Sequence, residues 1–259
     1  MILKTDKEIA LMRKAGLLLW ETHQQAKTLV REGISTKEID FVVEDYILSN
    51  GAEPLFKGVP GVVPFPASAC ISVNDEIVHG IPSERTLVAG DIVSIDIGVK
   101  LNGWCADAAA TWPVGEISAD KQKLLDATEN ALRYAIKALA QKKRWTQISR
   151  KMQEQIESCG FSVVEDLLGH GIGRGLWEAP EIPNFYCTFI DDFKIEKGAV
   201  LAIEPMVNMG SKHVAQLNDH WTIVTRDKLP SAHFEHTVAV TKNGPIVLTC
   251  GPDGEGWAM

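Results

Sequence analysis

The chain has no long hydrophobic run. Lys4, Asp6, Lys7 and Glu8 place charges near its start, where a secretory signal would need an unbroken apolar core. No later stretch approaches the roughly 20 apolar residues that a membrane span requires. We therefore expect neither a secretory signal nor contact with a membrane.

Cysteine is scarce as well, and its spacing argues against a disulfide scaffold. The five cysteines are Cys70, Cys105, Cys159, Cys187 and Cys250. They include no CxxC pair, and an odd number cannot form a fully paired framework. A reducing cytoplasm is the expected location.

Basic residues are fewer than acidic ones. The 26 Lys and Arg against 34 Asp and Glu give a formal net charge of −8 at pH 7, without long acidic runs. A nucleic-acid-binding protein would show a clustered basic face, so we expect no nucleic-acid partner. What is present, 45% hydrophobic and 23% charged residues in a chain of 259, is typical of a soluble globular protein with a sizeable core.

Two amphipathic helices are predicted near the N-terminus. Apolar residues recur at helical spacing in residues 5–20, and Thr5 followed by Glu8 has the spacing of a capping box. A second helix opens at residues 35–38 and ends at the Asn-Gly pair of residues 50–51. The chain therefore begins with two helices.

A loop and a strand follow. Residues 58–66 contain three prolines and two glycines, which predicts a loop that could carry function. Residues 91–99 alternate, so that one face carries valine and isoleucine while the other carries Ser94, Asp96 and Gly98. The alternation predicts a strand with one acidic side chain on its less apolar face.

The same order of elements recurs in the second half. Residues 120–142 and 146–159 predict helices, and residues 198–204 predict a strand. Residues 89–96 (AGDIVSID) align with residues 197–204 (KGAVLAIE), and each segment closes on a carboxylate. This recurrence favours a duplicated unit.

The duplication sets the expected domain organisation. We interpret residues 1–259 as a single catalytic domain built from two pseudo-repeats, approximately 1–113 and 118–248. Each repeat would bring a carboxylate-bearing strand to the centre. A functional site is therefore expected between the two halves.

An Asn-Gly pair sets the positions of two acidic residues. Residues 101–104 read Leu-Asn-Gly-Trp, the strongest short-range signal for a two-residue hairpin turn. This turn would pair Gly98 with Asp107 and Asp96 with Ala109, which makes Asp96 and Asp107 diagonal neighbours on one face. Their Cα atoms would lie about 7–8 Å apart, so the carboxylates could share a proton or bind a divalent cation.

The second half supplies further candidate ligands. Glu204 precedes Pro205 at a predicted strand end, Glu235 lies in the alternating run HFEHTVAV, and His170 lies in the glycine-rich segment GHGIGRG. With Asp96 and Asp107 they form an oxygen-rich set that suits Mn, Fe(II) or Co(II) and can also take Zn. Each residue alone also fits a purely structural role, such as a solvated strand face or a loop-stabilising histidine.

Several motifs, taken in order along nearly the entire chain, resemble the type I methionine aminopeptidase family of the pita-bread fold. They are VHGIP (78–82), SIDIGV with Asp96, the following Asp107, GHGIGRG (169–175), IEPM (203–206) and FEHT (234–237). The resemblance implies an α+β fold with an antiparallel sheet covered by helices. It also implies two divalent metal ions (Mn, Fe(II), Co or Zn) held by Asp96, Asp107, His170, Glu204 and Glu235.

The resemblance assigns further roles around the metals. It implies that His79 is a catalytic imidazole near the scissile amide and not a metal ligand. Phe65, Cys70 and Trp221 match positions that line the family's pocket for the methionine side chain. Without the family, these three would be interpreted as core residues and His79 as a loop histidine.

One departure from the family concerns substrate contact. After GHGIGRG the family usually continues with an aromatic residue and a histidine, where this chain has Leu176 and Trp177. An indole can donate one hydrogen bond but cannot take up a proton as an imidazole does. Val62 stands where the family often has an aromatic residue, so the substrate pocket is expected to be reshaped.

The resemblance implies a metal-dependent cytoplasmic hydrolase that acts as a monomer and removes the N-terminal methionine from peptides and nascent proteins. Glu204 would shuttle protons and His79 would stabilise the tetrahedral intermediate. Two alternatives remain open. One is an X-Pro-type aminopeptidase, although such enzymes usually carry an additional N-terminal domain. The other is a catalytically silent homologue that binds peptides, which the histidine missing at Trp177 keeps possible.

Overall fold

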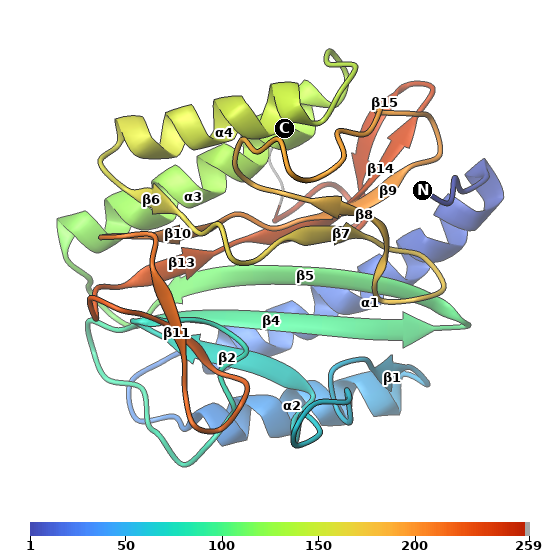
Figure 1. Cartoon of the computed structure of the whole chain (residues 1–259). Helices are drawn as coiled ribbons and strands as arrows, with labels where there is room; N and C mark the ends of the chain where they lie inside the picture. The colour runs from blue at the N-terminus through green and yellow to red at the C-terminus, as the bar shows by residue number, and fades with distance from the viewer. Residues whose placement is uncertain (257–259) are drawn as a thin grey trace.

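The computed structural model of the chain describes residues 1–256 (Figure 1). Its helices are α1 (Asp6–Leu29), α2 (Thr36–Ser49), α3 (Ala119–Ala138) and α4 (Thr146–Ser158). Its strands are β1 (Glu53–Pro54), β2 (Ala69–Val73), β3 (Glu76–Val78), β4 (Ile92–Leu101), β5 (Trp104–Pro113), β6 (Ser162–Val163), β7 (Gly169–Gly171), β8 (Glu178–Ile182), β9 (Val200–Ile203), β10 (Met206–Asn208), β11 (Val214–Gln216), β12 (Ile223–Thr225), β13 (Ser231–His233), β14 (Glu235–Thr241) and β15 (Gly244–Val247). No helix of this part is long and apolar enough to cross a membrane.

Capping boxes begin both N-terminal helices, and the first of them was predicted. The Thr5 hydroxyl accepts a hydrogen bond from the Glu8 N–H of α1, while the Glu8 carboxylate accepts one from the Thr5 N–H. Ser35 and Glu38 repeat this exchange at the start of α2. The α2 helix ends before Gly51, whose φ of 70° is readily available only to glycine.

Strands from both halves of the chain share one antiparallel sheet. Its order is β1-β4-β5-β14-β9-β7-β8, with β2 also pairing with β4 and β15 with β14. Two smaller sheets, β13-β10-β6 and β11-β12-β3, complete the strand layer. The large sheet therefore joins β4 and β5 of the first half to β14 and β9 of the second.

The helices lie behind the strands (Figure 1), and each half contains a cluster of buried apolar residues. Apolar side chains of α1 and α2 pack with those of β2 and β4 in the first half. Side chains of α3 and α4 pack with those of β9 and β14 in the second. The predicted α+β class and helix-covered antiparallel sheet are confirmed, whereas the duplication stays a prediction.

The predicted hairpin is confirmed, including its register. Residues 102–103 form its turn with φ angles of 51° and 79°, the sign that this Asn-Gly turn requires. Gly98 pairs with Asp107, and Asp96 pairs with Ala109. The two aspartates therefore occupy the diagonal positions on adjacent strands that the sequence predicts.

Two elements are shorter than predicted. The α3 helix ends at Ala138 and not at residue 142, because the Leu139 N–H is already shared among several carbonyls, as is common at helix ends. The strand predicted for residues 198–204 is β9, which begins only after Gly198, whose φ of 92° forms a turn. Glu204 therefore lies just beyond β9, next to Pro205.

Candidate metal centre

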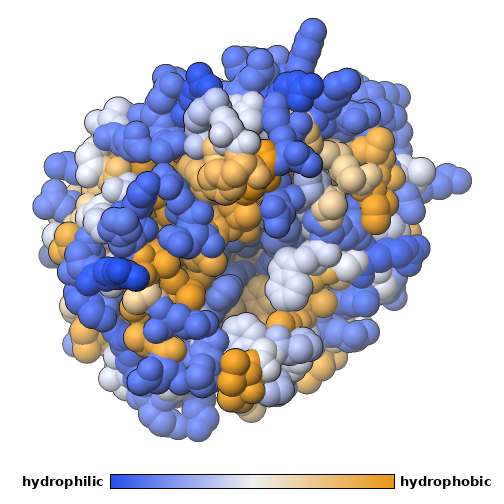
Figure 2. Space-filling model, in the orientation of Figure 1, coloured by the Kyte–Doolittle hydropathy of each residue, from blue (hydrophilic) through white to orange (hydrophobic). Residues whose placement is uncertain are grey.

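A cavity of about 620 Å³ opens between the two halves of the sheet. Figure 2 shows hydrophobic side chains gathered around a hollow in the face that Figure 1 presents. All the site residues predicted from the sequence line this cavity: Phe65, Cys70, His79, Asp96, Asp107, His170, Trp177, Glu204, Trp221 and Glu235. Its volume is in the range of small-ligand sites.

Three carboxylates come from three neighbouring strands. Ala109 of β5 pairs with Asp96 of β4 on one side and with Glu235 of β14 on the other. Asp107 lies two residues before Ala109, so it shares the same face of the sheet. Asp107 is further tied to β14, because its N–H donates to the Thr237 hydroxyl and its carbonyl accepts from that hydroxyl. Strand pairing alone thus gathers these acidic groups.

The remaining two candidates come from β7 and the end of β9. His170 pairs with Ala202, so Glu204, two residues beyond, comes close to it. The amide of the fully buried Asn184 donates to the Glu204 carbonyl and holds this segment after the strand ends. His170 Nε2 lies 3.7 Å from both Asp107 Oδ2 and Glu204 Oε1. All five candidate ligands therefore converge on the cavity.

His170 presents an unprotonated nitrogen to the carboxylates. Its Nδ1 lies 3.0 Å from the Gly171 carbonyl oxygen, and that contact requires a proton on Nδ1. Burial also lowers the pKa of His170, which favours the neutral ring. In this tautomer Nε2 carries a lone pair, as a metal ligand must.

The four buried carboxyl groups are unfavourable in their ionised form when no cation is bound. Burial raises the pKa of Asp107 to about 7. Burial, and then the charge of Asp107, raise the pKa values of Asp96, Glu204 and Glu235 well above the ordinary carboxyl range. Without a compensating positive charge, these groups would hold protons near neutral pH.

The donor set fits divalent cations. Asp96 Oδ1, Asp107 Oδ1 and Glu235 Oε1 are buried, and within residues 1–256 they have no hydrogen-bond partner. One triplet of ligand atoms, from Asp107, His170 and Glu235, lies within 4.8 Å of one another. Buried acceptors without partners are rare in native proteins unless an ion or water satisfies them. Carboxylate oxygens with an imidazole nitrogen are suitable ligands for transition metals.

Sequence analysis missed His233. A second triplet, from Glu204, His233 and Glu235, also brings its ligand atoms within 4.8 Å of one another. The available signal was period-two alternation, since His233 and Glu235 are two residues apart and can face the same side.

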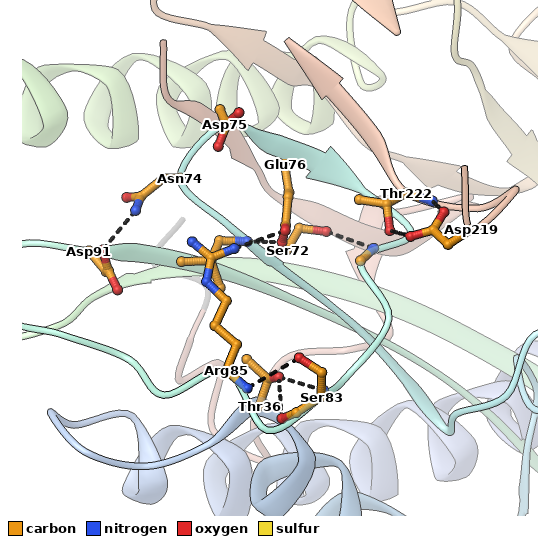
Figure 3. Close-up of polar contacts among 12 residues, drawn as sticks. Thr36, Ser72, Asn74, Asp75, Glu76, Ser83, Arg85, Asp91, Asp219 and Thr222 are labelled. Carbon is orange, nitrogen blue, oxygen red and sulfur yellow. Dashed lines mark hydrogen bonds and ion pairs between the residues drawn. The ribbon is translucent and has the colours of Figure 1, made fainter. Parts of the chain in front are cut away.

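His79 lies at the cavity wall directly after β3, in a left-handed conformation with φ 58°. The next N–H, that of Gly80, donates to Ser72 Oγ at 3.1 Å. Thr222 Oγ1 lies 3.4 Å from the His79 carbonyl oxygen and 2.6 Å from Asp219 Oδ2. Figure 3 shows Ser72, Thr222 and Asp219 together beside this strand. These neighbours hold the backbone of His79 from both sides.

The imidazole of His79 is neutral and faces an aromatic wall. Desolvation lowers the pKa of His79 to about 4. Its ring centroid is 6.3 Å from that of Trp221, in an edge-to-face arrangement. At neutral pH this side chain can donate through its one N–H but carries no charge.

An apolar compartment adjoins the carboxylates. Phe65 and Trp221 meet edge to face with centroids 5.3 Å apart, and the Trp221 indole N–H donates to the Val63 carbonyl at 2.7 Å. Cys70 pairs with Asp96 across β2 and β4, and burial raises the pKa of its thiol well above the usual range. Cys70 is therefore a neutral thiol in an apolar wall. Gly98 makes space for the ring of Phe56, because a Cβ at this position would meet that ring.

Trp177 lies at the rim of the cavity and is 61% exposed. Its loop is held by the next residue, Glu178, whose carboxylate accepts from Lys4 Nζ at 2.6 Å and from the N–H groups of Arg174 and Gly175. Val62 is 80% exposed in the loop of residues 58–66. Other lining residues that the sequence did not indicate are mostly apolar: Phe56, Val59, Val78, Leu167, Leu168 and Met206.

Comparisons with known proteins agree with this arrangement. The model of metallopeptidase family M24 matches residues 10–242. A methionine aminopeptidase of Clostridium perfringens (strain 13 / Type A) is 51% identical over 248 residues, which cover 96% of this chain and 98% of that protein. The crystal structure of a Thermotoga maritima methionine aminopeptidase has a TM-score of 0.91 and 38% identity, covering 96% of this chain and 99% of that one. A Pyrococcus furiosus prolidase has a TM-score of 0.76 and 25% identity, covering 96% of this chain and 65% of that one.

Proposed function

The chain belongs to metallopeptidase family M24 and, within it, to the methionine aminopeptidases, and from this membership we propose that it removes the N-terminal methionine from peptides and nascent proteins. The observation that carries the proposal is the convergence of five candidate metal ligands beside an apolar compartment of the same cavity. Such a compartment suits a single unbranched apolar side chain.

The family is one of metallopeptidases, so the chain uses divalent metal ions. We propose two ions, drawn from Mn, Fe(II), Co or Zn and held by Asp96, Asp107, His170, Glu204 and Glu235. The partnerless buried oxygens and the 3.7 Å contacts of His170 support this ligand set. When bound, the ions would supply Lewis acidity toward the scissile carbonyl and toward the attacking water.

The proton transfers are assigned to Glu204. Its carboxylate would take a proton from the attacking water and deliver it to the leaving amine. A carboxylate that lies beside the attacking water can take up its proton and return it to the leaving group. Glu204 also lies within 3.7 Å of His170, on the wall where the ligands converge.

His79 is assigned to the developing oxyanion. Its neutral ring would donate one hydrogen bond to the oxygen that gains charge in the transition state. The backbone contacts of Gly80 and Thr222 would keep the donor in place while the substrate binds. A preorganised donor of this kind needs little rearrangement during the reaction.

The apolar compartment is assigned to the methionine side chain. Phe65, Cys70 and Trp221 would surround it, and this role is supported by the burial of Phe65 and Cys70 and by the edge-to-face packing of Phe65 on Trp221. Trp177 at the rim would contact the peptide beyond the scissile bond. Its indole can donate a hydrogen bond there but cannot exchange a proton.

We extend the proposal to the state of the protein in the cell. The five free cysteines support a location in the reducing cytoplasm, where we expect the protein to act as a monomer. The single catalytic domain with pseudo-repeats at approximately 1–113 and 118–248 is supported by one hydrophobic cluster within each half and by another that contains residues of both halves. Nascent chains would reach the site through the opening beside Trp177.

The two alternatives have less support. An X-Pro-type aminopeptidase would share the fold, but the prolidase is less similar in TM-score and identity than the methionine aminopeptidase structure. A catalytically silent peptide-binding module has no need for five converging ligands, three of which have buried oxygens without a partner within residues 1–256. Neither alternative explains the compartment lined by Phe65 and Trp221 as directly.

Peptide assays with added Mn, Co or Fe(II) distinguish the three functions. Release of methionine from Met-Ala peptides, dependent on metal, is expected. Asp96→Asn should abolish it, whereas Asp45→Asn, the same change at an exposed position of α2, should leave it intact. Cleavage of X-Pro peptides alone would support the first alternative, and no cleavage by the folded, metal-loaded protein would support the second.

A further inference from the structure

His233 is a buried histidine whose environment within the protein leaves it unsatisfied. Its side chain is 1% exposed, and within residues 1–256 neither ring nitrogen has a hydrogen-bond partner. A neutral imidazole has one N–H and one lone pair, and burying both without partners is costly. Such a group in a native structure calls for an explanation, commonly an ion or an ordered water.

The imidazole points toward the acidic cluster. His233 ends β13, pairs with Met206, and lies two residues before Glu235. Its Nε2 is 3.7 Å from Glu204 Oε2. Nitrogen and oxygen atoms of His233, Glu204 and Glu235 all lie within 4.8 Å of one another. The ring is therefore aimed at the same center that the carboxylates share.

The 3.7 Å separation distinguishes a ligand from a hydrogen-bond partner. An N–H···O hydrogen bond has a length of about 2.7–3.2 Å, so this contact is too long for one. Two atoms that each lie about 2.0–2.2 Å from one cation are roughly 3–4 Å apart. His170 has the same 3.7 Å separation from the other oxygen of Glu204. Glu204 thus has one imidazole facing each of its carboxylate oxygens.

We propose that His233 is a further metal ligand, which shares a cation with Glu204 and Glu235 within the two-ion site that Asp96, Asp107 and His170 complete. This inference rests on the proposed metal-dependent function and adds a ligand outside the five already assigned. A neutral imidazole leaves the charge of the site unchanged. It favors Zn, Co and Fe(II) over Mn, since imidazole suits those ions and carboxylates suit Mn.

Counting nitrogens tests the proposal without measuring activity. The protein is loaded with Mn(II), and pulsed electron paramagnetic resonance counts histidine nitrogens coupled to the metal, with ¹⁵N-histidine confirming their origin. Two histidines are expected for the unmodified protein and one for His233→Gln. His236→Gln alters a partly buried histidine that alternates to the opposite face of β14, so it should retain both.

Titration calorimetry gives a second readout. His233→Gln should weaken one of the two cation positions by more than about 100-fold for Zn or Co, beyond the 10–100-fold typical when an outer-shell partner is lost. The loss for Mn should be smaller. His233→Phe, which keeps a ring but removes both nitrogens, replaces the glutamine variant if that variant does not fold.

The outcomes separate this inference from the proposed function. A single coupled histidine in the unmodified, metal-loaded protein overturns the inference alone, whether or not any variant folds. The inference is also overturned if His233→Gln keeps the same metal affinity and the same number of histidines coupled to the metal. If the unmodified protein binds no divalent cation, both the inference and the proposed function fail.

Discussion

Removing the metal ions and raising the pH should destabilise this protein sharply. Burial raises the pKa of Asp107 from 3.8 to about 7. Between these values the folded, metal-free state holds a proton that the unfolded state has released. The stabilisation is therefore fully present below pH 4 and is lost as the pH rises through about 7.

The magnitude follows from the size of the shift. One retained proton changes the free energy of unfolding by about 1.4 kcal/mol per pH unit. Over the roughly three units between the two pKa values of Asp107, the loss reaches about 4 kcal/mol. Such a loss is a large part of the 5–15 kcal/mol that stabilises a typical domain. Asp96, Glu204 and Glu235, whose pKa values burial also raises, should extend the loss to higher pH.

Thermal unfolding followed by circular dichroism from pH 5 to 8 measures this effect. The melting temperature of the metal-free protein should fall by about 3–5 °C per pH unit for each retained proton. Saturating metal should flatten the slope, because bound ions displace the protons. Asp107→Asn should reduce the slope of melting temperature against pH by about the contribution of one retained proton. A metal-free melting temperature that stays level or rises over this range would refute the reasoning.

Four further substitutions test individual roles. Glu204→Gln at saturating metal should lower kcat by about 10²–10⁴-fold in peptide assays, and an unchanged kcat would exclude a proton shuttle. His79→Ala should lower kcat by about 10²–10³-fold with little change in KM, whereas a loss confined to KM would contradict oxyanion stabilisation. Trp177→His should change kcat/KM across a peptide series and add a pH dependence near the imidazole range; unchanged rate and specificity would show that this position does not contact substrate. Lys4→Met should destabilise the protein by about 3 kcal/mol in urea unfolding, because it leaves the largely buried Glu178 carboxylate without its cation. A loss under about 1 kcal/mol would show that the backbone N–H groups of Arg174 and Gly175 stabilise this carboxylate without Lys4.

Local sequence signals predicted the elements that short-range chemistry controls. Thr5 with Glu8 and Ser35 with Glu38 satisfy backbone groups of the first helical turn, so both helix starts were visible in the sequence. The Asn-Gly turn determined the register of β4 and β5, and with it the placement of Asp96 beside Asp107.

Long-range pairing placed the residues that sequence reasoning missed. His233 meets Glu204 because β13 pairs with β10, and no local pattern specifies which strands become neighbours. Phe56 enters the cavity wall because Gly98, more than 40 positions along the chain, has no side chain there. A hydrophobic pattern indicates burial but not the partner.

The sequence by itself determined the helix starts, the hairpin and the acidic and imidazole groups available for binding metal, since each depends on residues a few positions apart. Only the tertiary structure decided that β5 pairs with β14, which brings Asp107 of one half beside Glu235 of the other. That decision rests on the burial of both cores together and on the pairing of backbone groups across the sheet, which are properties of the whole chain.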